Sequence, residues 1–314
     1  MIDLNVIEET LKYQLHKNLP AHKISEVYFY ATLPGGKFFR PMLAWSICKD
    51  LDPKLFDLSF TNKNSTHSLL ATSLELHHTY TLLHDDLPCM DDDQMRRGKP
   101  CTHIKYNEWM ALLAGDGLLN ISYQLVSKIK HPNAMNALNF YSWATGPKGL
   151  IHGQVLDLSH EMKESMDNTL KTHELKTARL IQVAICTSAM LTDSKLDTNT
   201  FKKLYRFSKL LGINFQLIDD LSELAEKDLG QHEIDVNPWL HFTDECYKIT
   251  LKNLENFEHL SKELNLIATN AIVKNYYQKM LSIIVSDLDT INEHLKNKVD
   301  LAPIVLSLKS FGNL

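Results

Sequence analysis

Apolar residues recur every three or four positions along much of the chain, which is the period of an amphipathic helix. Residues 1 to about 18 place Ile2, Val6, Leu11 and Leu15 on one helical face. The same spacing runs from 266 to 295, at Val273, Tyr277, Met280, Ile284, Leu288, Ile291 and Leu295. Glycine and proline make up only 21 of the 314 residues, against about 12% in an average protein. Turn signals are therefore sparse, and the pattern predicts an all-α protein.

Polar stretches divide the helical pattern. Residues 52–66, 159–172 and 225–240 are predicted to be connectors. Hydrophobic residues make up 44% of the chain, which is enough for a large core, and there is no internal repeat. All-helical folds can run to this length as one unit, so we expect a single domain over residues 1–314.

Charge and cysteine content narrow the class of protein. The net charge of −5 and the lack of a basic stripe argue against nucleic-acid binding. The five cysteines are scattered without a CxxC motif, which is typical of reduced thiols in a cytosolic protein. The N-terminal MIDLNVIEET lacks the apolar stretch of a signal peptide, and no apolar run is long enough for a membrane span. We therefore expect a cytoplasmic protein.

One stretch, YTLLHDDLPCMDDDQMRRGKPCTH from Tyr80 to His103, carries the densest charge. It holds five aspartates within residues 85–93, followed by Arg96 and Arg97. Carboxylates this close repel one another, and a bound cation relieves the repulsion. Magnesium prefers oxygen ligands and bridges one or two carboxylates to substrate phosphates. The planar fork of arginine matches phosphate oxygens. The stretch therefore predicts a magnesium and diphosphate site.

Helical geometry alone does not bring the first and later aspartates together. Asp85 and Asp91 are six residues apart, about 120° out of phase on a helix. Pro88 lies between them and interrupts the helical hydrogen bonds. We expect a two-residue bulge within Leu87–Met90 that returns Asp91 to the face of Asp85. The alternative is a solvated acidic loop after a helix.

A second acidic helix is predicted at residues 211–224, LGINFQLIDDLSEL. Asp219 and Glu223 are four residues apart, as are Gln216 and Asp220, so these polar groups form one stripe on an apolar helix. Ionised groups on such a helix are costly unless they are paired or bound to metal. We therefore expect the two acidic helices to face each other across a cavity. The alternative is a seam exposed to solvent.

Cations and a histidine accompany the acids. Lys37 and Arg40 follow a glycine pair and could meet an anion near a helix start, although surface charges are the ordinary explanation. Lys176 and Thr177 lie near the start of a predicted helix and could hold a phosphate. No Cys/His spacing fits a closed zinc site, so we expect His78 to be packed or to face a diphosphate.

These blocks occur in the order of a known family. GGKFFRP, HDDLPCMDDDQMRRGKPCTH, AGDGLL, HGQVLDL, LKT and FQLIDDLSE cover residues 35 to about 224. Together they resemble the trans-isoprenyl diphosphate synthases, the polyprenyl synthetase family, of the bacterial short-chain type. The DDxxxxD motif followed by RRG is very specific, and the other blocks are strong jointly. The resemblance implies ten to twelve helices around a deep central cavity, and a homodimer.

The resemblance also implies a reaction between isopentenyl diphosphate and an allylic diphosphate, with about three Mg²⁺ ions. The implied metal ligands are Asp85, Asp91 and Asp219, supported by Asp86, Asp220 and Glu223. The implied partners of the departing allylic diphosphate are Arg96, Lys176, Thr177 and Gln216. The implied site for isopentenyl diphosphate is Lys37, Arg40, His78 and Arg97. Asp85, Asp86, Asp219 and Lys176 would be catalytic, because they neutralise charge as the allylic C–O bond ionises.

Tyr80 is the candidate that sets product length. It lies five residues before Asp85, about 7.5 Å away along a helix, where a bulky ring would stop the growing tail. With the two-residue insertion in the acid block, this resembles bacterial farnesyl diphosphate synthases. We therefore expect farnesyl diphosphate as the product, made from dimethylallyl or geranyl diphosphate. Alternatively, Tyr80 is only core packing.

Other functions share much of this pattern. A geranylgeranyl or geranyl diphosphate synthase would differ only at the cavity floor. A non-catalytic prenyl synthase subunit would keep the fold but lose metal binding. A class I terpene cyclase would have an Asn/Ser/Glu metal motif in place of the second aspartate pair.

Several residues depart from the family pattern. Glu223 stands where the family usually has Asp, Phe38 where it has a basic residue, and His152 where it has glycine. The family's lysine in the connector after the second acid block is missing, with Ile234 near its place and Lys227 as a possible substitute. These departures concern turnover rather than the fold.

Overall fold

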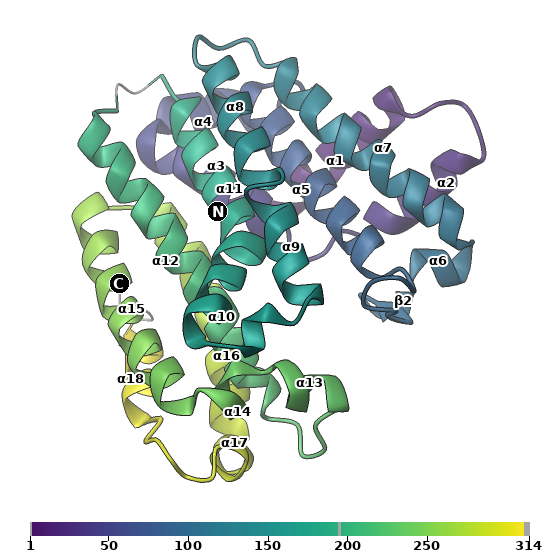
Figure 1. The fold of residues 1–314 in the computed structure, drawn as a ribbon. Helices are drawn as coiled ribbons and strands as arrows, with labels where there is room; N and C mark the ends of the chain where they lie inside the picture. The colour runs from purple at the N-terminus through teal and green to yellow at the C-terminus, as the bar shows by residue number, and fades with distance from the viewer. Residues whose placement is uncertain (1, 194–195, 311–314) are drawn as a thin grey trace. The chain divides into compact units, whose positions relative to one another are not determined.

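The computed structural model describes residues 2–193 and 196–310, and almost every segment in it is helical (Figure 1). This confirms the prediction of an all-α protein. In the described chain the α-helices run from α1 to α18, more than the ten to twelve expected. A two-stranded hairpin is the one sheet in these residues.

The surplus helices are short ones in stretches predicted to be connectors. Helix α4 (Pro53–Ser59), helix α10 (Met166–Thr172) and helices α13 (Gln231–Val236) and α14 (Pro238–His241) all fall there. These connectors contain short helices because helix caps are present in them. Asp52 accepts from the N–H of Leu55, and Ser165 accepts from that of Asn168. Such caps satisfy the otherwise unpaired N–H groups of a first turn.

Two compact units are defined by contacts within the chain. We call residues 1–142 with 187–195 the first unit, and residues 143–186 with 196–314 the second unit. The expectation of a single domain stays a prediction.

The first unit is centred on helix α5 (Thr66–Asp85), which packs on α7 (Glu108–Ser127) and α3 (Phe39–Leu51). Leu70 and Leu74 of α5 are fully buried. The remaining elements are α1 (Leu4–Asn18), α2 (Ile24–Thr32), α4, β1 (Met95–Arg96), β2 (Lys99–Pro100), α6 (Thr102–Lys105) and most of α8 (Ala134–Thr145).

The second unit is centred on helix α12 (Thr198–Glu223), which packs on α15 (Thr243–Leu264) and on the π-helical turn η2 (His173–Ala178). Phe207 of α12 stacks on Phe257 of α15 with ring centroids 4.6 Å apart. The other elements are α9 (Leu150–Leu158), η1 (Glu161–Lys163), α10, most of α11 (Arg179–Met190), α13, α14, α16 (Ile267–Ser286), α17 (Leu288–His294) and α18 (Ala302–Ser310).

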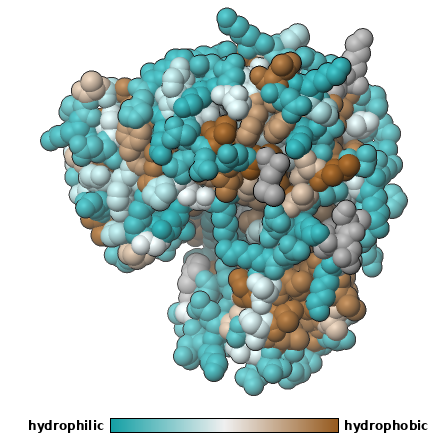
Figure 2. Space-filling model, turned by 180° about the vertical axis from the view of Figure 1, so that it is seen from behind, coloured by the Kyte–Doolittle hydropathy of each residue, from teal (hydrophilic) through white to brown (hydrophobic). Residues whose placement is uncertain are grey.

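The surface carries both hydrophilic and hydrophobic residues. Figure 2 shows hydrophilic residues over much of the face in view, with hydrophobic patches between them. Within residues 2–193 and 196–310, no helix has both the length and the apolar character that a bilayer crossing needs.

Candidate active site

The first acid block lies where helix α5 ends. The helix stops at Asp85, and Pro88 in the following turn has no N–H with which to continue the ladder. The chain turns back instead. The N–H of Asp91 donates to the carbonyl oxygen of Asp85 at 2.9 Å, and that of Asp92 donates to Leu87 at 3.2 Å. The turn therefore brings the backbone of Asp91 beside Asp85.

The hairpin after the acid block positions two arginines. Strands β1 and β2 pair antiparallel, and the residues between them, Arg97 and Gly98, both have positive φ, as a tight hairpin turn requires. Asp86 Oδ1 accepts from Arg96 Nε at 2.9 Å and from Nη2 at 2.6 Å. Asp93 also accepts from Nη2. Asp86 is buried and holds Arg96 in place in this structure.

A buried cationic cluster forms around Glu75 of α5. Glu75 is 2% exposed, and its Oε1 accepts from Arg97 Nη2 at 3.3 Å. Burial raises the pKa of Glu75, while the charges of Arg97 and Arg40 lower it. Burial lowers the pKa of Arg40 to about 10, and the Nε of Arg40 has no hydrogen-bond partner. Arg97 therefore pairs with a buried carboxylate on which the charge of Arg40 also acts.

His78 completes this cluster. Burial is the main cause that keeps the pKa of His78 well below its ordinary value, and the charges of Arg40 and Arg97 lower it further. The ring is therefore neutral at pH 7. The loop before α3 approaches closely, because a Cβ on Gly36 would lie 3.1 Å from the Arg97 guanidinium. Lys37, the next residue, is exposed. The structure thus places Arg40, His78 and Arg97 near one another, and their role in binding a diphosphate stays a prediction.

Tyr80 lies two residues after His78 on α5. It is 6% exposed, and its ring meets those of His77 and His84 edge-on, with centroids 4.6 Å and 5.6 Å away. Burial raises its pKa, and so do the charges of Tyr123 and Asp85. The role of Tyr80 in product length stays a prediction.

In the second unit, the π-helical turn η2 presents Lys176 and Thr177. π-helical turns are rare and are often found at functional sites. Helix α9 approaches the turn closely, because a Cβ on Gly153 would clash with the backbone nitrogen of Lys176. Lys176 Nζ donates to Asp157 Oδ2 of α9.

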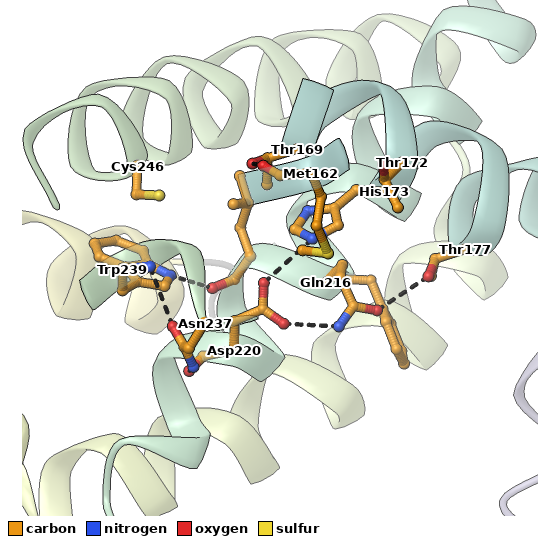
Figure 3. A network of polar contacts seen from close by, with 12 residues as sticks. Met162, Thr169, Thr172, His173, Thr177, Gln216, Asp220, Asn237, Trp239 and Cys246 are labelled. Atoms are coloured by element: carbon orange, nitrogen blue, oxygen red, sulfur yellow. Dashed lines mark hydrogen bonds and ion pairs between the residues drawn. The ribbon is translucent and has the colours of Figure 1, made fainter. Parts of the chain in front are cut away.

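A chain of hydrogen bonds connects η2 to the second acid block (Figure 3). Thr177 Oγ1 donates to Gln216 Oε1 at 3.0 Å, and Gln216 Nε2 donates to Asp220 Oδ1 at 2.7 Å. His173 Nε2 lies 3.5 Å from Asp220 Oδ2. Asn237 Nδ2 donates to the carbonyl oxygen of Asp220 at 2.7 Å. The stripe of polar groups predicted on this helix is therefore held by both the π-helical turn and the segment after α13.

These groups border a pocket of about 170 Å³. Its lining includes Asp157, Lys176, Asp220, Glu223 and Glu233. Burial raises the pKa of Asp220 well above its ordinary value, and the charges of Asp219 and Glu233 add to this. Glu223 is exposed as a residue, but its carboxyl group is largely buried. This burial, together with the charge of Asp220, raises the pKa of Glu223 to about 9.

The donor set of this pocket fits a hard cation. Its carboxylates are oxygen ligands of the kind that Mg²⁺ prefers, and Asp220 Oδ2 is buried without a hydrogen-bond partner. Burial lowers the pKa of His173 to about 4, so its ring brings no positive charge to the pocket. Asp219, the predicted metal ligand, precedes Asp220 on α12. Among the residues that the structure covers, no three His, Cys, Asp or Glu side chains form a ready-made metal site.

Sequence reasoning missed Glu75, His173 and Glu233 as candidates for the site. The spacing of residues in the sequence could have identified Glu75 and His173. Glu75 lies three residues before His78 on an apolar helix, and His173 lies three residues before Lys176. Residues with that spacing share a helical face. Glu233 carried no such signal, because its stretch was read as a connector.

The chain is similar to known proteins over most of its length. The family model for polyprenyl synthetase matches residues 21–235. A farnesyl diphosphate synthase of Bacillus subtilis is 32% identical over 234 residues, which covers 72% of this chain and 75% of the relative. A geranylgeranyl diphosphate synthase of Cyanophora paradoxa is 34% identical over 237 residues, which covers 72% and 74%.

Solved structures give a similar result. A geranyltransferase of Helicobacter pylori superposes with a TM-score of 0.74 at 27% identity, covering 87% of this chain and 97% of that one. A Helicobacter pylori geranyltransferase complexed with magnesium and isoprenyl diphosphate has a TM-score of 0.72 at 26% identity, covering 88% and 96%.

The buried cluster in the first unit gives a test. Glu75→Gln removes the carboxylate that Arg40 and Arg97 share, so we expect it to lower the free energy of unfolding by about 3–5 kcal/mol. Urea unfolding followed by circular dichroism measures this change. Glu9→Gln, at an exposed ion pair with Lys12, is the control, and we expect about 1 kcal/mol or less. Equal effects of the two variants would contradict the role given to Glu75.

Proposed function

Because the chain belongs to the polyprenyl synthetase family, we propose that it condenses isopentenyl diphosphate head-to-tail with dimethylallyl or geranyl diphosphate to give farnesyl diphosphate. Family membership supports prenyl chain condensation, and the chain length is the proposal. The observation that carries it is the pair of charge clusters. One places Arg40 and Arg97 near the single buried carboxylate of Glu75, and the other is rich in carboxylates. A diphosphate would pair with the guanidinium groups, and magnesium would bind the carboxylates.

Magnesium would be held by Asp85, Asp91 and Asp219, with about three ions in the complex. Mg²⁺ usually takes one or two protein carboxylates together with substrate phosphates and waters, which suits aspartates this densely spaced. The magnesium in the Helicobacter pylori geranyltransferase complex supports this assignment. When bound, the metal would neutralise charge on the departing diphosphate.

The cluster around Glu75 would hold isopentenyl diphosphate. Arg40 and Arg97 carry forked donors that match phosphate oxygens, and the neutral ring of His78 can donate one more hydrogen bond. Lys37, exposed on the neighbouring loop, would close over the anion. Glu75 keeps the two guanidinium groups together without neutralising both.

The residues around the allylic diphosphate would stabilise its leaving charge. Arg96 and Lys176 are held by Asp86 and Asp157, and each has further N–H donors for the phosphate oxygens. Thr177 and Gln216 are fixed by their mutual hydrogen bond. Asp86 and Asp220 act through the groups they hold.

The proposed step breaks the allylic C–O bond, and its electron pair leaves with the diphosphate. The double bond of isopentenyl diphosphate then attacks the allylic carbon. A proton passes from the new cation to the departing diphosphate. The protein positions the reactants, matches their charge and excludes water from the cation. We expect this reaction in the cytoplasm, without nucleic acid or membrane.

Incubation with Mg²⁺, isopentenyl diphosphate and each allylic diphosphate tests the function. We expect a C15 diphosphate from both allylic substrates and no product after chelation of the metal. A C20 or C10 product would identify a synthase of another length. A hydrocarbon formed without use of isopentenyl diphosphate would identify a terpene cyclase, and no product would identify a silent subunit.

Product length is tested at Tyr80. Tyr80→Ala removes the ring that packs between His77 and His84 one turn before the acid block. We expect longer products, measured by chromatography of the dephosphorylated prenols. Tyr80→Phe keeps the ring and serves as the control, with C15 retained. An unchanged product distribution for Tyr80→Ala would show that another residue stops the tail.

We also propose a homodimer that uses the exposed face of α7. Trp109, Leu112 and Leu113 lie at helical spacing and are 56%, 44% and 51% exposed. Leu113→Lys should convert dimers to monomers in sedimentation velocity. Leu58→Lys, at an 82% exposed position on α4, should leave the dimer intact. A dimeric Leu113→Lys variant would place the interface elsewhere.

A further inference from the structure

Glu174 in the π-helical turn η2 and Arg179 directly after it are joined through both backbone and side chains. The N–H of Arg179 donates to the carbonyl oxygen of Glu174, which is the hydrogen bond between residues five apart that defines a π-helix. Arg179 Nη2 also lies 3.0 Å from Glu174 Oε1 in an ion pair. The same two residues therefore close the turn twice.

The ion pair depends on the π-helical register. In an α-helix, residues five apart are rotated by about 140°, at roughly 100° per residue, so their side chains do not face each other. A π-helical turn takes in one residue more, which brings residues five apart onto the same side. Because an α-helical turn would separate Glu174 from Arg179, their ion pair favours the π-helical form.

Neighbouring side chains hold both members of the pair in place. Arg179 is 8% exposed, and its Nη1 donates to Tyr205 OH at 2.8 Å. Its guanidinium group lies over the ring of Trp143, 4.8 Å from the ring centroid. The second carboxylate oxygen of Glu174, Oε2, lies 2.6 Å from Lys209 Nζ of α12. Losing the acid would leave a buried cation without its ionic partner, which is costly.

Two helices pack directly against the backbone of the turn. A Cβ on Gly153 of α9 would lie 2.3 Å from the backbone nitrogen of Lys176. A Cβ on Gly212 of α12 would lie 2.3 Å from Ala178 Cβ. A change to the α-helical register would rotate the residues after the turn by about 100° relative to those before it. Such a change would break the fit on both sides.

The turn carries two side chains of the pocket described above. Thr177 Oγ1 donates to Gln216 Oε1 at 3.0 Å, and Figure 3 shows Thr177 directed toward Gln216. Lys176, Thr177 and Gln216 all line the pocket of about 170 Å³. Glu174 and Arg179 are not among its lining residues. They therefore act on a bound ligand only through the turn that they hold.

We propose that Glu174 and Arg179 are positioning residues, whose ion pair keeps η2 in the π-helical register that directs Lys176 and Thr177 at the ligand of the pocket. That this ligand is the allylic diphosphate rests on the proposed function, but the role of the pair in the turn does not. Without the pair, the N–H of Arg179 would donate to the carbonyl oxygen of Leu175, as in an α-helix. Lys176 and Thr177 would then turn away from their partners.

Hydrogen exchange of the ligand-free full chain tests the register. Glu174→Gln should speed amide exchange in a peptide spanning residues 170–182 about tenfold, because it weakens a charged hydrogen bond. A crystal structure of this variant should show the N–H of Arg179 bonded to Leu175. Lys209→Met is the matched control, because it removes the other ion pair of Glu174 and leaves the pair with Arg179. It should exchange like the unmodified chain.

Variants of Arg179 separate an ionic role from general packing. Arg179→Lys keeps a positive charge opposite Glu174 and should retain most of the protection from exchange. Arg179→Met keeps an unbranched side chain without charge and should lose that protection. Circular dichroism melting shows whether either variant has unfolded. Equal exchange in the two folded variants would contradict the ionic role.

Steady-state kinetics test what the turn positions. Glu174→Gln should raise KM for the allylic diphosphate and lower kcat about tenfold or more, because a misplacement of about 1 Å can cost about a hundredfold in rate. KM for isopentenyl diphosphate should stay the same, since its proposed residues belong to the first unit. A loss of folded protein would instead lower kcat without changing either KM. Lys209→Met should leave all three values unchanged.

The outcomes separate this role from the proposed function. Equal exchange in Glu174→Gln and Lys209→Met, or a π-helical hydrogen bond retained in the Glu174→Gln crystal structure, would overturn the role of the pair. If exchange changes as expected but no prenyl product forms, the pair still holds the turn and the proposed function fails. If product forms and Glu174→Gln exchanges like the unmodified chain, the function stands and the positioning role fails.

Discussion

Ionisable side chains held away from water are the constraint on which the rest of the structure depends. Arg97 pairs with the buried carboxylate of Glu75, and the charge of Arg40 also acts on it, so the first unit sets two cations near one buried acid. The second unit gathers Asp220, Glu223 and Glu233 around a pocket whose lysine is already bound. Removing charges from water is costly unless a partner replaces the water. We propose that an anion balances the first cluster and that cations balance the second; a diphosphate with magnesium would provide both.

The positions of these charges follow from local geometry. Ending α5 at Asp85 allows a turn that brings Asp91 back to it, and the tight hairpin beyond sets Arg96 against Asp86. The π-helical turn η2 places Thr177 within reach of Gln216. The turn after α5, the hairpin and the π-helical turn are each short, and each fixes side chains that would otherwise sample many rotamers. Preorganised groups of this kind stabilise developing charge without rearranging during the reaction.

Periodicity predicted the long elements because burial on one face leaves a clear trace in the sequence. The helices around Leu70 and around Asp219 were found in this way. The short helices were missed, since α4 and α10 depend on single capping residues, Asp52 and Ser165, rather than on an apolar stripe. Charge density identified both acid blocks. The pairing of Lys176 with Asp157, nineteen residues earlier, could not be read from the sequence, because it depends on how closely Gly153 lets two helices approach.

The central claim is that the two acid blocks hold one diphosphate through magnesium. A crystal structure with Mg²⁺ and an unreactive allylic diphosphate analogue tests it most directly. The account predicts Asp85, Asp91 and Asp219 around the same diphosphate, each bound to a metal ion that also contacts its oxygens. A complex in which Asp85 and Asp219 serve separate ligands, or in which the analogue binds without metal, would contradict it.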